Sequence, residues 1–244
     1  AIGSFVQVVV TRLHVAPLAK SRSKCLSCGE ALRISDLIPV VSYLILAGKC
    51  KYCRTPYGIS AVIVEITYGL LFVLLYHFVL AGQGSLLISS LWLLYYALLF
   101  IMLGIVALYD AKHTYIPIPY LFIYLMLSFV MLIMRYIAEP TSITLLAPLL
   151  VSLPFLLMWI ITRSKGVGFG DVLLFFGVGA FFGIEQGFAV LLLAIWIGAL
   201  VGIFSYFVQK KRNMMIPFVP FIVVPFWIVL FTDIDIFSIA QIFA

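Results

Sequence analysis

Charged side chains are scarce in this sequence: they make up 10 % of the 244 residues, whereas a soluble domain carries about 25 %. Apolar residues make up 65 %, more than a soluble fold can cover. So few charges exclude a nucleic-acid-binding domain, which needs cations for phosphates, despite the net charge of +6. High hydropathy excludes a disordered chain, and four cysteines in a chain this long exclude a small secreted disulfide scaffold. The composition predicts a polytopic membrane protein.

Uncharged apolar stretches of about 17–25 residues are typical of transmembrane helices. Such stretches run over residues 59–80, where Glu65 is the one charge, and over 86–109, 116–134, 143–161, 187–208 and 216–231. A less regular one, which contains Asp171, runs over 167–182. Residues 1–10 are too short to span a bilayer, and we interpret them as the truncated end of a first helix rather than a signal peptide. We therefore expect an all-α polytopic membrane protein with about eight transmembrane helices.

The basic residues predict the orientation of these helices. If eight spans alternate, every Lys and Arg except Arg135 falls on one side, and that side includes residues 11–58. Cytoplasmic loops retain Lys and Arg, so this side should be cytoplasmic and the amino terminus should lie outside. The opposite side would carry the loops around Glu139 and Glu185 and the tail with Asp233 and Asp235.

The four cysteines form two Cys-x-x-Cys pairs, Cys25 with Cys28 and Cys50 with Cys53, inside the soluble segment 11–58. Two such pairs are typical of a four-thiolate zinc site, because each turn supplies one edge of a tetrahedron. Two disulfides or buried thiols are the alternative, but a reducing cytoplasm disfavours disulfides. Four protein ligands leave no open coordination position, so the zinc would be structural.

Two aspartates at the cytoplasmic boundary are candidates for chemistry. Asp110 ends one span, and Asp171 closes the sequence Gly168-Phe169-Gly170-Asp171. The apolar run after Asp171 is short for a bilayer, so this glycine-rich stretch should enter the membrane region, where Gly168 and Gly170 allow close backbone approach. Two such carboxylates in one cavity could share a proton and activate a water for peptide hydrolysis. The alternative is that each aspartate only caps a loop or a helix.

Taken together, these features resemble the type IV prepilin peptidase family, the bifunctional leader peptidases and N-methyltransferases with a Gly-x-Gly-Asp motif. Besides the cysteine pairs and both aspartates, the resemblance rests on Gly3-Ser4-Phe5-Val6-Gln7-Val8-Val9, Arg12-Leu13, Arg22-Ser23-Lys24-Cys25, Asp36-Leu37-Ile38-Pro39, Val64-Glu65, Ile116-Pro117 and Ile216-Pro217-Phe218.

The resemblance implies an inner-membrane enzyme that removes the basic leader of type IV prepilins or type II secretion pseudopilins. It also implies methylation of the new amino terminus with S-adenosylmethionine, which composition and spacing do not show. Asp110 and Asp171 match the catalytic aspartates. The expected organisation is a truncated first helix (1–10), a cytoplasmic zinc-binding loop (11–58) and a membrane-embedded aspartic peptidase domain (59–244) in contact with lipid.

The sequence departs from the family pattern at several positions. Gln7 replaces an Asn, Lys112 replaces a second Asp, and Ile118 replaces an Asn or Asp. Leu173 stands where a Lys is frequent, which removes a cation that could pair with an acid or with a cofactor carboxylate.

Three other acidic residues are candidates for substrate or cofactor contact. Glu65, inside a predicted helix, could contact the substrate amine or the cofactor, or it could be hydrogen-bonded to a neighbouring helix. Glu30 and Asp36 could bind a basic leader. Two other function classes stay open: a presenilin-like intramembrane protease, which also uses Tyr-Asp and Gly-x-Gly-Asp pairs, and a non-enzymatic transporter or assembly scaffold.

Overall fold

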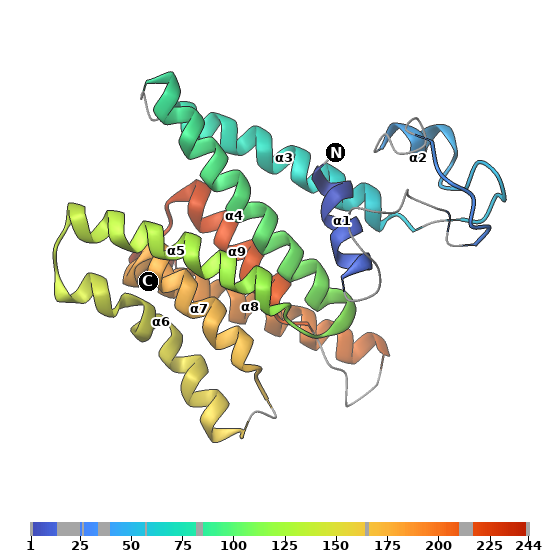
Figure 1. Cartoon of the computed structure of the whole chain (residues 1–244). Helices are drawn as coiled ribbons and strands as arrows, with labels where there is room; N and C mark the ends of the chain where they lie inside the picture. The colour runs from blue at the N-terminus through green and yellow to red at the C-terminus, as the bar shows by residue number, and fades with distance from the viewer. Residues whose placement is uncertain are drawn as a thin grey trace. The chain divides into compact units, whose positions relative to one another are not determined.

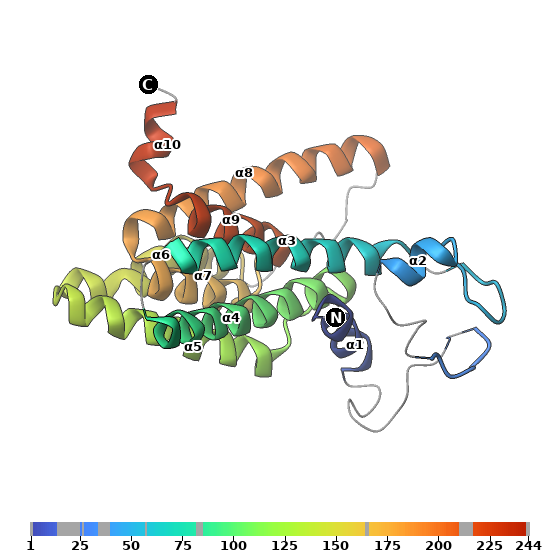
Figure 2. The same cartoon turned by 90° about the horizontal axis from the view of Figure 1, so that it is seen from above.

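The structure, a computed structural model, describes residues 2–13, 25, 27–33, 40–56, 58–81, 85–163, 166–209 and 217–242. The chain divides into two compact units, Ala1–Ala97 and Leu98–Ala244. Figures 1 and 2 show that both units are built from helices. Because the division falls inside one long helix, that helix contributes to both units.

The first unit contains α1 (Ile2–Arg12), the short α2 (Val41–Ile45), α3 (Ser60–Ala81) and the beginning of α4 (Leu86–His113). α1 packs against α3 and buries Val6, Val9 and Val10. These residues recur at the spacing that places side chains on one face of a helix. The four cysteines lie between α1 and α3 in the sequence.

The second unit contains the rest of α4, α5 (Ile118–Ala138), α6 (Ser142–Ile161), α7 (Phe169–Phe182), α8 (Ile184–Gln209), α9 (Val219–Thr232) and α10 (Ile236–Ile242). α7 is the central element of this unit (Figure 1): it packs against α5, α6 and α8, and most of its side chains are buried. The outer faces of α5, α6 and α8 expose many large apolar side chains, as expected for helices in contact with lipid.

The structure confirms an all-α protein with several apolar helices. In the part of the chain that the structure describes, five helices are long and apolar enough to cross a membrane, namely α3, α4, α5, α6 and α8, and α1, α7 and α9 are shorter apolar helices. Together they correspond to the eight expected from the sequence. No strand occurs in the ranges that the structure describes, apart from isolated bridging residues.

Two helix boundaries differ from the sequence-based expectation and matter for the site. α4 continues past residue 109 to His113. Asp110 therefore lies inside the last turn of α4 and does not terminate the helix. Lys112 and His113 favour this extension, because cations stabilise a helix carboxyl terminus. α9 begins at Val219 rather than at residue 216, with Pro217 and Phe218 preceding it.

α6 and α7 approach each other closely at Gly179. A Cβ atom at this position would lie 2.6 Å from the carbonyl oxygen of Ala147 and 2.8 Å from Cα of Pro148. Both atoms belong to the backbone of α6, so no side-chain rotation could make room. Small residues at such contacts are a common way for membrane helices to pack tightly.

We therefore expect Gly179→Ala to destabilise the protein by about 1–3 kcal/mol, because the two helix backbones must move apart. Gly69→Ala on α3 is the matched control, since a Cβ atom there meets no other atom within 4 Å. The measurement is the thermal unfolding temperature in detergent. A Gly179→Ala variant as stable as Gly69→Ala would contradict this account of the packing.

Candidate active site

Asp110 lies in the last turn of α4 and is only 6 % exposed. Its Oδ2 atom accepts a hydrogen bond from the backbone N–H of Val219, at a distance of 3.0 Å. Val219 is the first residue of α9. Amides in the first turn of a helix have no partner within the helix and carry a partial positive charge. The start of α9 therefore orients and stabilises the Asp110 carboxylate.

Asp171 is the third residue of α7 and is 9 % exposed. Its Oδ2 atom accepts a hydrogen bond from the backbone N–H of Gly168 at 3.2 Å, and its own N–H donates to the Gly168 carbonyl at 3.1 Å. Asp171 thus also lies at a helix amino terminus. The helix cap considered from the sequence is present at Asp171, whereas Asp110, for which the alternative was a loop cap, accepts its hydrogen bond from the start of α9.

Gly170 brings the loop after α4 against the start of α7. A Cβ atom at Gly170 would lie 2.6 Å from Cδ1 of Ile116, which belongs to the loop between α4 and α5. At Gly168 a Cβ atom would make only an ordinary 3.4 Å contact with the Asp171 carboxylate. A side chain at position 170 would therefore have to displace Ile116, whereas one at position 168 would displace nothing.

The structure brings the two aspartates together within the second unit. Asp110 and Asp171 lie close enough for an electrostatic interaction between their carboxylates. Both are buried and each accepts a backbone hydrogen bond, so their side chains are held in defined orientations. Such a pair can share one proton and hold one water between its oxygens.

Two parts of this site were not predicted from the sequence. One is the backbone amide of Val219, which no residue type can signal; only the prolines at 217 and 220, typical of helix starts, mark the place. The other is an aromatic group beside Asp110. The ring of Tyr109 lies 4.5 Å from that of His113 and 6.3 Å from that of Tyr115, measured between centroids.

Glu65 contacts the neighbouring helix in the first unit. Its Oε2 atom accepts hydrogen bonds from the N–H of Ser4 at 2.6 Å and from the hydroxyl of Ser4 at 3.0 Å. These bonds agree with the alternative of a hydrogen bond to a neighbouring helix, and a contact of Glu65 with substrate or cofactor stays a prediction. Glu30 is exposed beside the cysteines, and its carbonyl accepts from the N–H of Cys25. Asp36 lies outside the described residues.

The four cysteines gather in the first unit, all as free thiols. All four sulfur atoms lie within 4.8 Å of one another, and the sulfurs of Cys25 and Cys53 are 3.8 Å apart. A tetrahedral zinc ion with Zn–S bonds of about 2.3 Å places its sulfur ligands about 3.8 Å apart. Both the donor atoms and their spacing therefore fit a zinc ion.

The two cysteine turns have the same backbone hydrogen bonds. The N–H of Cys25 donates to the carbonyl of Glu30, and the N–H of Gly29 donates to the carbonyl of Cys25. In the second turn the N–H of Cys50 donates to Thr55 and the N–H of Arg54 donates to Cys50. The fifth residue of each turn has a positive φ, 73° at Gly29 and 60° at Arg54.

Hydrogen bonds within the turns favour the thiolates of Cys25 and Cys53, whereas burial and the neighbouring Cys25 thiol raise the pKa of Cys28 to about 11. The hydroxyl and amide of Thr55 lower the pKa of Cys53 to about 6. The amides of Cys28 and Ser27 lower the pKa of Cys25. Because the thiolate is the form that binds metal, these turns are suited to holding a cation.

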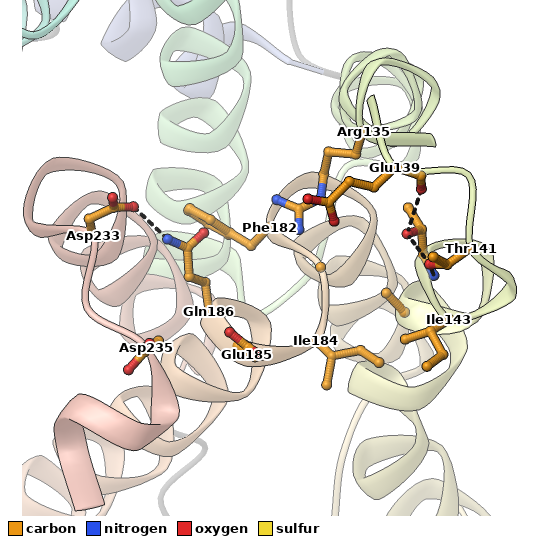
Figure 3. A pocket seen from close by; sticks show the side chains of 13 residues that line it. Arg135, Glu139, Thr141, Ile143, Phe182, Ile184, Glu185, Gln186, Asp233 and Asp235 are labelled. Atoms are coloured by element: carbon orange, nitrogen blue, oxygen red, sulfur yellow. Dashed lines mark hydrogen bonds between the residues drawn. The ribbon is translucent and has the colours of Figure 1, made fainter. Parts of the chain in front are cut away.

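A cavity of about 450 Å³ lies at the opposite end of the second unit. It is formed where α5, α7 and α9 end and where α6 and α8 begin, whereas the aspartates lie near the end of α4 and the starts of α7 and α9. Figure 3 shows its polar side chains, with Gln186 donating to Asp233 at 2.6 Å. Its lining includes Arg135, Glu139, Glu185, Asp233 and Asp235. Neither Asp110 nor Asp171 lines this cavity, so we do not place the chemistry there.

Several known proteins are similar to this chain over most of its length. The chain is 27 % identical to a prepilin leader peptidase/N-methyltransferase of Burkholderia pseudomallei, over 91 % of this chain and 79 % of that protein. Proteins of the same name from Pseudomonas aeruginosa and Vibrio cholerae are 28 % and 26 % identical, over 87 % and 95 % of this chain and 72 % and 92 % of theirs. No solved structure matches the chain.

Two family models match consecutive parts of the chain. The model of the bacterial peptidase A24 N-terminal domain matches residues 1–79, and the model of the type IV leader peptidase family matches residues 97–203. The second range contains both Asp110 and Asp171, and the first contains all four cysteines. The chain therefore belongs to the type IV leader peptidase family.

Proposed function

We propose that this protein cleaves the basic leader from type IV prepilins or type II secretion pseudopilins, with Asp110 and Asp171 as its catalytic residues. Family membership supports prepilin processing in general. The observation that carries the catalytic assignment is the convergence of two buried carboxylates, each fixed by a backbone amide at a helix start.

The chemistry follows from the paired carboxylates. One carboxylate takes a proton from the bound water, whose oxygen then attacks the carbonyl carbon of the scissile peptide bond. The other carboxyl group is protonated. It donates a hydrogen bond to the carbonyl oxygen as negative charge develops on that oxygen, and it keeps its proton. The tetrahedral intermediate then collapses, the C–N bond breaks, and the leaving nitrogen takes the proton that the first carboxyl group gained from water. The pair ends with the one shared proton with which it began.

The substrate would approach with its apolar helix in the lipid and its basic leader in the cytoplasm. The end of the second unit that carries the aspartates also carries Lys112 and Arg163, while the opposite end carries the acidic cavity. This polarity supports an inner-membrane protein whose catalytic end faces the cytoplasm. We propose from the alternation of the spans in the sequence that the amino terminus lies outside. Since that face is basic, a basic leader must be bound by local acids, for which we propose Glu30 and Asp36.

We propose that the four cysteines of the first unit hold one structural zinc ion. This ion would link the two turns and would have no open coordination position for catalysis.

We also propose methylation of the new amino terminus with S-adenosylmethionine, supported by the names of the relatives. Glu65 already accepts two hydrogen bonds from Ser4, so its contribution to either activity would be through the position of α1.

Asp110→Asn and Asp171→Asn should each lower the rate of leader removal by about 10²–10⁴-fold, because an amide cannot take the proton from water. The assay incubates purified protein with a prepilin and S-adenosylmethionine, and mass spectrometry identifies the new amino terminus and any added methyl group. Asp233→Asn, in the cavity at the other end, is the matched control and should cleave normally. Normal cleavage by a folded Asp110 or Asp171 variant would remove that residue from the active pair.

The two glycines of the motif should differ in importance. Gly170→Ala should lower kcat/KM about tenfold, since the new methyl group displaces Ile116 and with it the loop after Asp110. Gly168→Ala should stay close to wild type. The double variant Ile116→Ala with Gly170→Ala should recover activity relative to Gly170→Ala alone, because the contact is then relieved. Equal losses at the two glycines would show that this contact does not govern the site.

The protein purified without chelators under reducing conditions should contain about one zinc ion per chain, measured by elemental analysis. Cys50→Ser should release this metal and lower the thermal unfolding temperature, because Cys50 is the buried ligand of the cluster. Ser27→Ala, an exposed change in the first turn, should retain it. Protein that holds no metal and contains two disulfides would refute the zinc assignment.

A further inference from the structure

We propose that Phe218 is a positioning residue for the catalytic pair: its ring fixes the start of α9 so that the Val219 amide stays on the Asp110 carboxylate. This inference rests on the proposed peptidase function. It assigns a role to a side chain outside the proposed catalytic pair.

The first observation is the shortage of amides at the start of α9. Pro217 and Pro220 have no N–H group, and the N–H of Phe221 donates to the carbonyl of Phe218. The amides left at this helix start are those of Phe218 and Val219, and both interact with Asp110. The position of these two peptide units therefore decides how the Asp110 carboxylate is held.

The second observation is that α9 lacks the usual device that fixes a helix start. Phe218 occupies the N-cap position, with φ −93° and ψ −27°, and makes no side-chain capping hydrogen bond. A capping Ser, Thr, Asp or Asn would have joined its side chain to the amide of the second or third helical residue. Phe218 has no side-chain acceptor for this, so other contacts must hold the helix start in place.

The third observation is the aromatic cluster around the Phe218 ring. This ring stacks on Phe155 of α6, with 5.4 Å between centroids and 29° between planes, and lies 6.5 Å from the ring of Phe175 of α7. Phe155 and Phe175 are themselves 4.3 Å apart and buried. A Cβ atom at Gly198 of α8 would lie 3.2 Å from the Phe218 ring. The ring is thus held against three helices.

The same cluster also bears on the second aspartate. Phe175 lies one helical turn after Asp171 on α7. The contact between Phe175 and Phe218 therefore ties the helix that carries Asp171 to the helix start that holds Asp110. A displacement of about 1 Å in such a pair can cost about 10²-fold in rate. Loss of the Phe218 ring should act on the rate of the chemical step rather than on substrate binding.

The test compares kcat and KM for prepilin cleavage among ring variants, each normalised to the folded fraction measured by gel filtration in detergent. Phe218→Leu should lower kcat about 10- to 100-fold with KM unchanged, and Phe218→Tyr, which keeps the ring, should restore most of kcat. Phe221→Leu is the matched control on the same helix. The Phe221 ring contacts that of Phe218 but, among the described residues, makes no ring contact with Phe155 or Phe175. The kcat of Phe221→Leu should therefore stay near that of the wild type.

The outcomes separate the two proposals. If the wild-type protein does not cleave prepilin, the proposed function fails. If it does, and folded Phe218→Leu keeps the wild-type kcat or loses only stability, the positioning role of Phe218 is wrong while the peptidase stands. Should Phe218→Leu not fold, Phe218→Met fills similar space without a ring and is judged by the same loss of kcat at unchanged KM.

Discussion

A buried carboxylate needs hydrogen-bond donors, and this requirement underlies the arrangement of the second unit. Water is the usual donor at a protein surface, but inside a bundle of apolar helices the donors must come from the protein. Here they are backbone amides at helix starts, Val219 for Asp110 and Gly168 for Asp171. α7 and α9 have 14 residues each, about 21 Å, which is short of a ~30 Å hydrocarbon core. Two short helices can begin at the depth where the carboxylates need them.

Much of this molecule could be predicted from the sequence, because membrane helices are marked by local composition. The apolar helices among the described residues follow from runs with almost no charge, and the cysteine cluster follows from two spaced pairs. Asp110 and Asp171 could be singled out because charge is so rare around them. In each case one stretch of sequence contained the whole signal.

The contacts between distant segments could not be predicted in the same way. The partner of Asp110 is a backbone amide more than a hundred residues away, and a backbone amide leaves no mark on residue type. The sequence left Glu65 with two alternatives, since its partner Ser4 lies on another helix. The unequal roles of Gly168 and Gly170 depend on Ile116, whose position relative to α7 follows only from the packed helices.

The repeated hydrogen bonds of the two cysteine turns bear on what a metal would contribute to the first unit. Each turn is closed by its own backbone bonds, over residues 25–30 and 50–55, and neither depends on the other for its shape. Each turn is therefore a local structure that brings its own two sulfurs together at little entropic cost. The cost lies in joining one turn to the other across the intervening chain, and it grows only slowly with the length of that chain. A bound ion would act as a cross-link between two turns that are already formed. The segment between the turns could therefore vary in length without altering the site.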